Sequence, residues 1–169
     1  SLHGNERIDT PVLDKLAMSG ARFARFYVSP VCAPTRASLM TGRYHPRTGM
    51  IGIRPGLDTI RSEEVTIAEM LKPAGYVSGC FGKWNLGFAP GSRPTDRGFD
   101  EYFGSISGNC DYYTYVHNGR NDLYRNTEPA TADGYSSFVF ADAACQFIRE
   151  NQRGPFFCYV AFTAAHYPN

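Results

Sequence analysis

The feature that most constrains the fold is an almost continuously apolar run near the end of the chain. Residues 155–162 read Pro-Phe-Phe-Cys-Tyr-Val-Ala-Phe and follow directly on Gly154. An apolar run of this length, without polar alternation, is typical of a strand buried on both faces of a mainly parallel sheet. Because helices cover both faces of such a sheet, the run predicts an α/β fold.

The rest of the chain supplies the helices and strands that this fold needs. Apolar residues at helical spacing predict helices at 10–20, 35–40, 66–74 and 138–150. Further strand-like runs cover residues 23–28 and 76–81. Asn118-Gly119 is a hairpin turn signal, and the Gly-, Pro- and Ser-rich stretch 88–108 is interpreted mostly as loop. Helices and strands therefore alternate, as in an α/β protein.

Composition and charge exclude several classes of protein. Hydrophobic residues make up 43% of the chain, which is too many for a disordered one. A net charge of +1 argues against a nucleic-acid binder, and no apolar run approaches the roughly 20 residues that span a bilayer. The first residues lack the apolar stretch of a signal peptide. The five cysteines include no Cys-x-x-Cys pair, which argues against a zinc or thioredoxin-type site.

Three polar clusters follow the strands at 23–28, 76–81 and 155–162. They are residues 32–36, residues 82–85 and His166. In open α/β sheets, ligands bind beyond the carboxyl ends of the strands, so we expect these clusters to meet. A helix N-terminus and the nearby Arg36 would lower the pKa of the Cys32 thiol, which favours a nucleophile. From spacing alone, a structural thiol remains equally open, and neither His45 nor His166 can be placed beside it.

Longer motifs resolve this choice. Residues 32–43 read Cys-Ala-Pro-Thr-Arg-Ala-Ser-Leu-Met-Thr-Gly-Arg, and residues 75–87 read Gly-Tyr-Val-Ser-Gly-Cys-Phe-Gly-Lys-Trp-Asn-Leu-Gly. These runs resemble the first and second signatures of the type I, formylglycine-dependent sulfatases. Residues 94–104 and 111–113 resemble the arylsulfatase B branch, and 165–168 resemble the family's later histidine motif. The resemblance covers nearly the whole chain and implies an alkaline-phosphatase-like α/β sandwich with a mainly parallel central sheet.

The resemblance also implies a chemistry. A formylglycine-generating enzyme oxidises Cys32 after reading Cys-x-Pro-x-Arg in the unfolded chain. The hydrated aldehyde attacks sulfur with one hydroxyl and releases sulfate with the other, which a serine could not do. By the same resemblance, Arg36 holds the diol, Lys83 contacts the sulfate, and His166 binds sulfate or protonates the leaving group. Cys32, as formylglycine, would also ligate a calcium ion, which prefers oxygen ligands.

The sequence departs from the family pattern in two respects. Asn85 stands where the second signature usually has histidine, and an amide cannot accept a proton near neutral pH. We therefore expect Asn85 to position the diol without acting as a base. The family's paired aspartate metal ligands lie upstream of Ser1, and a further Asp-Asn or Asp-Gln pair and a second lysine lie beyond Asn169. Residues 1–169 are thus interpreted as the N-terminal part of a sulfatase catalytic domain, inactive and poorly soluble by itself.

The leading hypothesis is a sulfatase that hydrolyses sulfate esters, with sulfated carbohydrates suggested by residues 94–113. One alternative is a phosphate or phosphonate ester hydrolase of the same superfamily. Another is a non-catalytic sulfatase-like protein that binds sulfated glycans, which Asn85 motivates. The family resemblance implies a secreted, periplasmic or lysosomal location.

Overall fold

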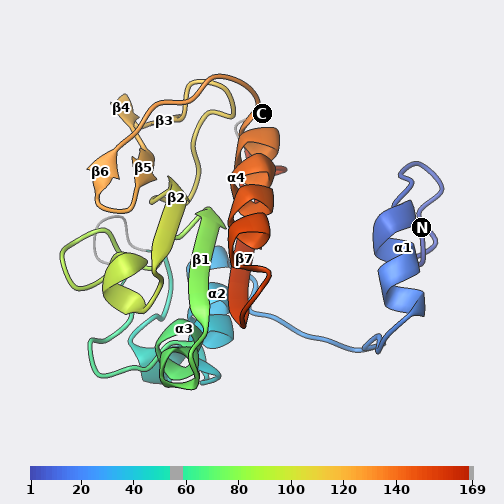
Figure 1. The fold of residues 1–169 in the computed structure, drawn as a ribbon, viewed down its shortest axis with the longest axis horizontal. Helices are drawn as coiled ribbons and strands as arrows, with labels where there is room; N and C mark the ends of the chain where they lie inside the picture. Colours follow the sequence, from blue (N-terminus) through green and yellow to red (C-terminus); the bar gives the residue numbers. More distant parts are fainter. Residues whose placement is uncertain (54–58, 168–169) are drawn as a thin grey trace.

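The computed structural model describes residues 1–53 and 59–167, and its centre is a mixed sheet of five strands (Figure 1). The strand order is β6-β5-β2-β1-β7. These strands are β1 (Val77–Gly82), β2 (Glu101–Ser105), β5 (Leu123–Arg125), β6 (Glu128–Pro129) and β7 (Phe156–Ala161). β1 pairs in parallel with β2 and with β7, whereas β5 and β6 add antiparallel pairs. The parallel centre of the sheet agrees with the α/β fold expected from the sequence.

Helices cover both faces of this sheet. On one face lie α2 (Cys32–Thr41) and α3 (Ile67–Leu71), which continues into the 3-10 turn η2 (Lys72–Ala74). On the other face α4 (Ser136–Asn151) runs along β1 and β7 (Figure 1). Neighbouring strand residues alternate between the two cores: Cys80 and Tyr102 pack with α2, whereas Phe81 and Phe103 pack with α4. This alternation follows from the two-residue period of a strand.

The remaining elements are short. Two 3-10 turns, η1 (His45–Thr48) and η3 (Thr95–Arg97), lie in the loops. A separate hairpin joins β3 (Val116–His117) to β4 (Arg120–Asn121). Its turn residues Asn118 and Gly119 both have positive φ, at 48° and 76°, as the Asn-Gly signal predicts.

The carboxyl end of β1 is held tightly between its two neighbours. A Cβ atom on Gly104 of β2 would lie only 1.9 Å from the Gly82 carbonyl oxygen, so only glycine allows this approach. Beyond Gly82 the backbone stays bonded to both sides. The Lys83 amide donates to the Ala161 carbonyl at 2.8 Å, and the Trp84 amide donates to the Ser105 carbonyl at 3.0 Å. Residues 83–85 are therefore fixed where three parallel strands end.

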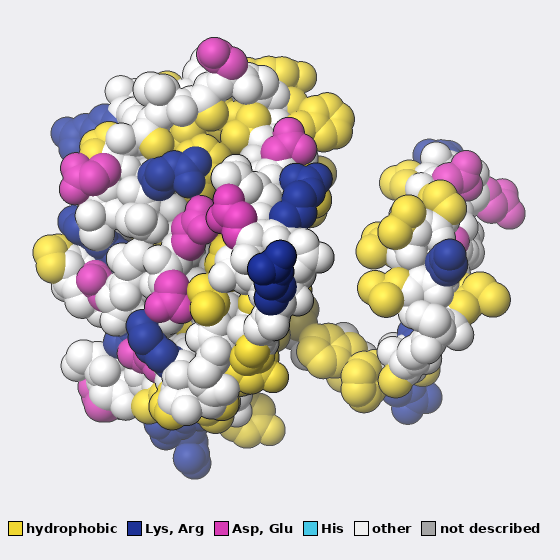
Figure 2. All heavy atoms as spheres, in the orientation of Figure 1, with side chains coloured by type: hydrophobic (Ala, Val, Ile, Leu, Met, Phe, Trp, Pro, Cys, Tyr) yellow, Lys and Arg dark blue, Asp and Glu magenta, His cyan; other side chains and the backbone are white. Residues whose placement is uncertain are grey.

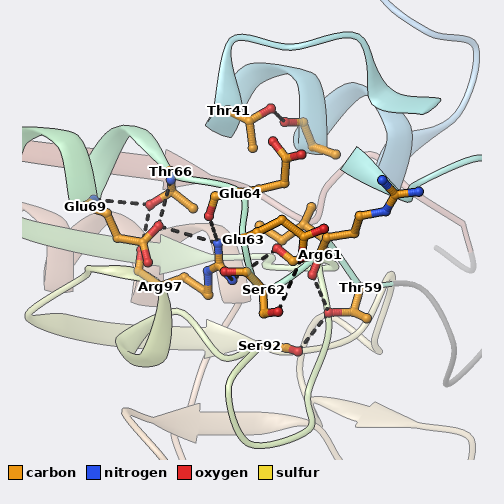
Figure 3. Close-up of polar contacts among 12 residues, drawn as sticks. Thr41, Thr59, Arg61, Ser62, Glu63, Glu64, Thr66, Glu69, Ser92 and Arg97 are labelled. Carbon is orange, nitrogen blue, oxygen red and sulfur yellow. Dashed lines mark hydrogen bonds and ion pairs between the residues drawn. The ribbon is translucent and has the colours of Figure 1, made fainter. Parts of the chain in front are cut away.

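A buried arginine fixes the segment before α3 to the loop before β2 (Figure 3). The Arg97 guanidinium donates to the backbone carbonyl of Glu64 and lies 3.5 Å from a Glu69 carboxylate oxygen. Thr66 donates to the Arg97 carbonyl at 2.7 Å and forms a reciprocal capping box with Glu69 at the start of α3. The Glu64 carboxylate in turn pairs with Arg43, just beyond the end of α2, at 2.8 Å.

The structure corrects three sequence-based expectations. Residues 101–105 lie inside the stretch interpreted mostly as loop, yet they form the strand β2. Residues 23–28 form no strand, because no described strand lies beside them to accept their hydrogen bonds. The run predicted to be buried on both faces is the edge strand β7, whose residues 156–160 are only half-buried. Within the described residues, one edge of β7 has no partner.

The N-terminal arm stands apart from the sheet. It carries α1 (Pro11–Met18), in which no residue is buried. Figure 2 shows hydrophobic side chains gathered along this arm, and Val12, Leu13 and Leu16 are all more than half exposed. Thr10 occupies the expected position before the helix, but its hydroxyl donates to the Asp14 carboxylate at 2.8 Å instead of capping a backbone amide.

Candidate active site at the carboxyl ends of the parallel strands

Cys32 is the first residue of α2, three residues earlier than the helix expected from the sequence. The side chains of Ala33, Pro34 and Ala37 are buried and fix this end of the helix against the sheet. The Thr35 hydroxyl donates to the Ser29 carbonyl at 2.8 Å and closes the turn that leads into the helix. The half-buried Cys32 side chain therefore lies at the positive end of the α2 dipole, which favours negative charge there.

Lys83 contacts Cys32 from the end of β1. Its side chain is 2% exposed, and its ammonium lies close enough to the Cys32 side chain to interact with it electrostatically. Burial, and then repulsion from Arg36, hold the pKa of Lys83 below its usual range, while attraction to Cys32 acts in the opposite direction. Among the described residues this buried ammonium is attracted by thiols and forms no ion pair, so it is suited to bind an incoming anion.

Arg36 lies one helical turn after Cys32 and ties α2 to two strands. Its Nη1 donates to the Lys83 backbone carbonyl at 2.8 Å and to the Tyr159 hydroxyl at 3.0 Å. Tyr159 belongs to β7, and burial raises the pKa of its hydroxyl. The guanidinium thus adds positive charge beside Lys83 and fixes the backbone that carries it.

Asn85 lies two residues after Lys83, and its side-chain oxygen receives no hydrogen bond from the described residues. Its φ of 59° is left-handed, a conformation that asparagine tolerates better than most residues. The Asn85 amide N–H donates to the Ile106 carbonyl at 3.1 Å. The side-chain Oδ1 is buried and has no hydrogen-bond partner among the described residues. This arrangement leaves an acceptor ready for a hydroxyl or water that would enter the site.

His166 lies in the turn that follows β7. Its amide donates to the Thr163 carbonyl at 3.0 Å, and its ring stacks on Tyr167 with 5.2 Å between ring centroids. Its Nδ1 lies 2.7 Å from the Tyr167 carbonyl oxygen. Among the described residues the structure brings Cys32, Arg36 and Lys83 into contact, but it places no hydrogen bond between His166 and these three. His45 lies elsewhere, with its Nδ1 2.7 Å from the Met50 carbonyl oxygen.

Sequence reasoning missed a second thiol near Lys83. Cys110 is 2% exposed, and its Sγ lies 2.8 Å from the Ser105 hydroxyl. Burial raises the pKa of this thiol, so it stays neutral. All five cysteines, Cys110 among them, are free. No spacing signal could have placed it near Lys83, because the contact depends on how the loop after β2 folds.

The described residues do not form a metal site by themselves. No group of three or more His, Cys, Asp or Glu side chains in residues 1–53 and 59–167 is arranged to hold an ion. Cys32 would offer calcium one oxygen after oxidation, which is far short of the 6 to 8 oxygens that calcium takes. We derive no step of the chemistry through a metal.

Taken together, these features define an α/β enzyme-like site in which the buried Lys83 and the half-buried Arg36 lie close to a residue at a helix N-terminus. The sulfatase family model matches residues 1–169, so the chain belongs to the sulfatase family. The resemblance drawn from the two signatures is thereby confirmed.

Curated relatives agree with this assignment. The chain is 38% identical to arylsulfatase J of Mus musculus, over 98% of this chain and 30% of that protein. It is 34% identical to N-acetylgalactosamine-6-sulfatase of Homo sapiens, over 99% of this chain and 37% of that protein. It is also 34% identical to an arylsulfatase of Klebsiella aerogenes, over 95% of this chain and 39% of that protein. The chain therefore spans 30% to 39% of the length of these relatives.

Solved structures agree on the fold. The structure of Ps i-CgsB matches with a TM-score of 0.89 at 31% identity, over 99% of this chain and 42% of that one. The PsFucS1 sulfatase from Pseudoalteromonas sp. matches with a TM-score of 0.78 at 25% identity, over 95% of this chain and 39% of that one. The fold is therefore part of the alkaline-phosphatase-like α/β architecture of sulfatases, as the resemblance implied.

Proposed function

We propose that the full-length protein hydrolyses sulfate esters, and that Cys32, Arg36, Lys83, Asn85 and His166 act in the reaction. The hydrogen bond of 2.8 Å from Arg36, one turn after Cys32, to the Lys83 carbonyl carries this proposal. The contact joins the two sulfatase signatures in space, and it places a fixed positive charge beside the residue that the family oxidises.

Formylglycine made from Cys32 would supply a hydrated aldehyde, with one hydroxyl to attack sulfur and a second to release sulfate. Lys83 donates hydrogen bonds to sulfate oxygens, and its charge stabilises the negative charge that develops in the transition state. Arg36 keeps Lys83 in place through the bond to its carbonyl and adds positive charge. Asn85 accepts a hydrogen bond from a hydroxyl at Cys32, and His166 binds sulfate or protonates the leaving oxygen.

A formylglycine suits the position of Cys32. The Cys32 side chain lies close enough to the Lys83 ammonium to interact with it, and an oxygen in place of the sulfur would accept a hydrogen bond from that ammonium more strongly. We further propose that this oxygen ligates a calcium ion, with the remaining ligands supplied from outside residues 1–169. A formylglycine-generating enzyme would be the partner during maturation.

Sulfated carbohydrates are the substrate class that we propose. Relatives are named as N-acetylgalactosamine-6-sulfatases, and a structural neighbour was solved with k-i-k-neocarrahexaose. Another neighbour was solved with D-glucosamine-2-N,6-O-disulfate. Among the described residues, no helix is long and apolar enough to cross a membrane. A secreted, periplasmic or lysosomal location is proposed on the family resemblance alone.

Peptide mass spectrometry of the protein from its native host tests the first step. The tryptic peptide of residues 26–36 contains Cys32, and its mass distinguishes an aldehyde from a thiol. We expect the aldehyde. An unmodified thiol, in a host that matures other sulfatases, would instead support the non-catalytic glycan-binding alternative.

Paired assays with an aryl sulfate and an aryl phosphate test the reaction class. We expect faster turnover of the sulfate, because residues 32–43 and 75–87, which carry Cys32 and Lys83, resemble the two sulfatase signatures. Faster turnover of the phosphate would support the phosphate or phosphonate ester hydrolase instead.

A further inference from the structure

We propose that Asn109 and Tyr112 are positioning residues that fix the ring tautomer and orientation of His166. The inference deepens the proposed function, because it rests on His166 taking part in sulfate ester hydrolysis. Neither residue belongs to the signatures around Cys32 and Lys83. Both lie in the loop that follows β2, and both reach across to the turn that follows β7.

The first observation concerns the Tyr167 carbonyl oxygen, which has two neighbours. The His166 Nδ1 lies 2.7 Å from it, and the Asn109 Nδ2 donates to it at 3.1 Å. A carbonyl oxygen only accepts hydrogen bonds, so His166 Nδ1 must carry the proton. In neutral His166 the other nitrogen, Nε2, is then the acceptor, and in the protonated ring Nε2–H is the remaining donor for sulfate or for the leaving oxygen. Asn109 holds the carbonyl that sets this tautomer.

The second observation concerns the backbone of His166 itself. Its amide donates to the Thr163 carbonyl, and its own carbonyl accepts from the Tyr112 hydroxyl. The His166 residue is therefore held on both sides by hydrogen bonds, one of them from the opposite loop. Rotation of the His166 ring is further limited by its stack on Tyr167.

The loop that carries the two donors is itself fixed. The buried Asp122 carboxylate accepts from the Ser107 amide at 3.1 Å and from the Ser107 hydroxyl at 2.7 Å. Tyr112 packs edge-on against Tyr135, and its carbonyl accepts from the Ser136 amide at 2.8 Å. Asn109 and Tyr112 are thus presented by a braced loop, which is what a positioning role requires.

A purely structural role predicts a different outcome. The bond from Asn109 to Tyr167 is exposed to solvent, and an exposed hydrogen bond adds little net stability. Its loss should leave the fold intact. The tautomer should respond, because neutral histidine that is free of constraint prefers the proton on Nε2.

The test is the ring ¹⁵N spectrum of the full-length protein at a pH where His166 is neutral. The His166 signals are assigned by their loss in His166→Gln, since the chain has four histidines. We expect the Nδ1–H form in the unmodified protein and a shift towards the Nε2–H form in Asn109→Ala and in Tyr112→Phe. Tyr113→Phe is the matched control, because it removes the neighbouring hydroxyl without touching the His166 turn.

Kinetics supply the second readout. We expect Asn109→Ala and Tyr112→Phe to lower kcat by up to about 100-fold, which is the smaller effect of losing a positioned general acid. KM should change less. An Nε2–H form in the unmodified protein, or the same tautomer in all variants, would overturn the proposal. A tautomer shift in a protein without sulfatase activity would keep it and reject the proposed function instead.

Discussion

Burial of the Lys83 ammonium destabilises the fold, and this unfavourable burial points to a functional role. An ammonium that is 2% exposed has lost most of its water, and among the described residues the groups that attract it are the thiols of Cys32 and Cys110. Its neighbour Arg36 adds repulsion. A side chain selected for stability alone would be apolar at this position, because burying an unbalanced charge lowers the free energy of unfolding.

Replacement of Lys83 by methionine should therefore separate activity from stability. We expect Lys83→Met to lower kcat/KM by about 100- to 1000-fold, as for the loss of one donor to a developing oxyanion. The midpoint of thermal unfolding should not fall, since the apolar stem is kept and the buried charge is removed. A lower midpoint would show that the ammonium stabilises the fold.

The pH dependence of that stability difference has a definite sign. The pKa of Lys83 is lowered in the folded protein, so between that pKa and the ordinary value of 10.5 the unfolded chain binds a proton that the folded protein releases. Stability of the unmodified protein then rises with pH in this window. Urea titrations should show that the free energy of unfolding of Lys83→Met exceeds that of the unmodified protein by a constant amount at lower pH. This difference should narrow as the pH rises towards 10.5.

Asn85 can be tested without disturbing its backbone. Its left-handed φ would strain alanine, whereas glycine and histidine tolerate that conformation. We expect Asn85→Gly, which removes the unpartnered Oδ1, to lower kcat by about tenfold, the cost of roughly one hydrogen bond. Asn85→His should match or exceed the unmodified protein. If both variants turn over substrate at the unmodified rate, Asn85 has no part in the mechanism.

At the residue scale, the sequence could predict which residues form the site but not where their side chains point. Cys32, Arg36 and Lys83 were found from motifs, and they do meet. The direction of the His166 ring towards Tyr167 was not predictable, because it depends on a carbonyl in the neighbouring residue. Cys110 and Tyr159 were missed because their place near Lys83 and Arg36 arises only when separate strands are packed together.

At the scale of elements, helices were predicted better than strands. The helix at 66–74 corresponds to α3 with η2, and the helix at 138–150 corresponds to α4 (Ser136–Asn151). The apolar periodicity of a helix is a local property of the sequence, so it can be recognised without knowing how the sheet is built. β2 contains Gly104 and Ser105 and follows a Gly- and Pro-rich stretch, so its composition indicates loop. Its strand structure is imposed by pairing with β1, which no local signal encodes.

The close approach of β1 and β2 gives a prediction for Gly104. A methyl group there would lie 1.9 Å from the Gly82 carbonyl oxygen and 2.6 Å from the Gly82 nitrogen. Because backbone atoms cannot move aside cheaply, we expect Gly104→Ala to lower the free energy of unfolding by about 3 kcal/mol, the upper end of the usual range for overpacking. Chemical denaturation of the full-length protein measures this change.

Gly154→Ala is the matched control. Nothing lies within 4 Å of a Cβ at Gly154, so the expected change is within about 0.5 kcal/mol. Equal effects of the two substitutions would contradict the argument that β1 and β2 meet through glycine.

At the scale of the whole molecule, the apolar surface is distributed unevenly. The two cores against the sheet are buried, but the arm of residues 1–31 exposes apolar side chains along α1 and along residues 23–28 (Figure 2). β7 adds an edge that is unpaired within the described residues. Exposed apolar stripes and open strand edges both favour association with other protein surfaces. The fold class was predictable from the alternating pattern, whereas this unequal burial was not, because burial depends on what covers each element.

The polypeptide of residues 1–169, produced by itself, should therefore associate as its concentration rises. Sedimentation velocity measures this, and we expect Leu16→Glu to reduce the association because it places a charge within the exposed stripe that Leu16 shares with Val12 and Leu13. Lys15→Glu is the control, since it also lies in α1, leaves the apolar side chains of the stripe unchanged and alters the net charge by more. If net charge governed the association, Lys15→Glu would reduce it at least as strongly as Leu16→Glu does. If the apolar stripe governs the association, only Leu16→Glu reduces it. A polypeptide that stays monomeric at all concentrations would contradict the argument that exposed apolar surface drives association.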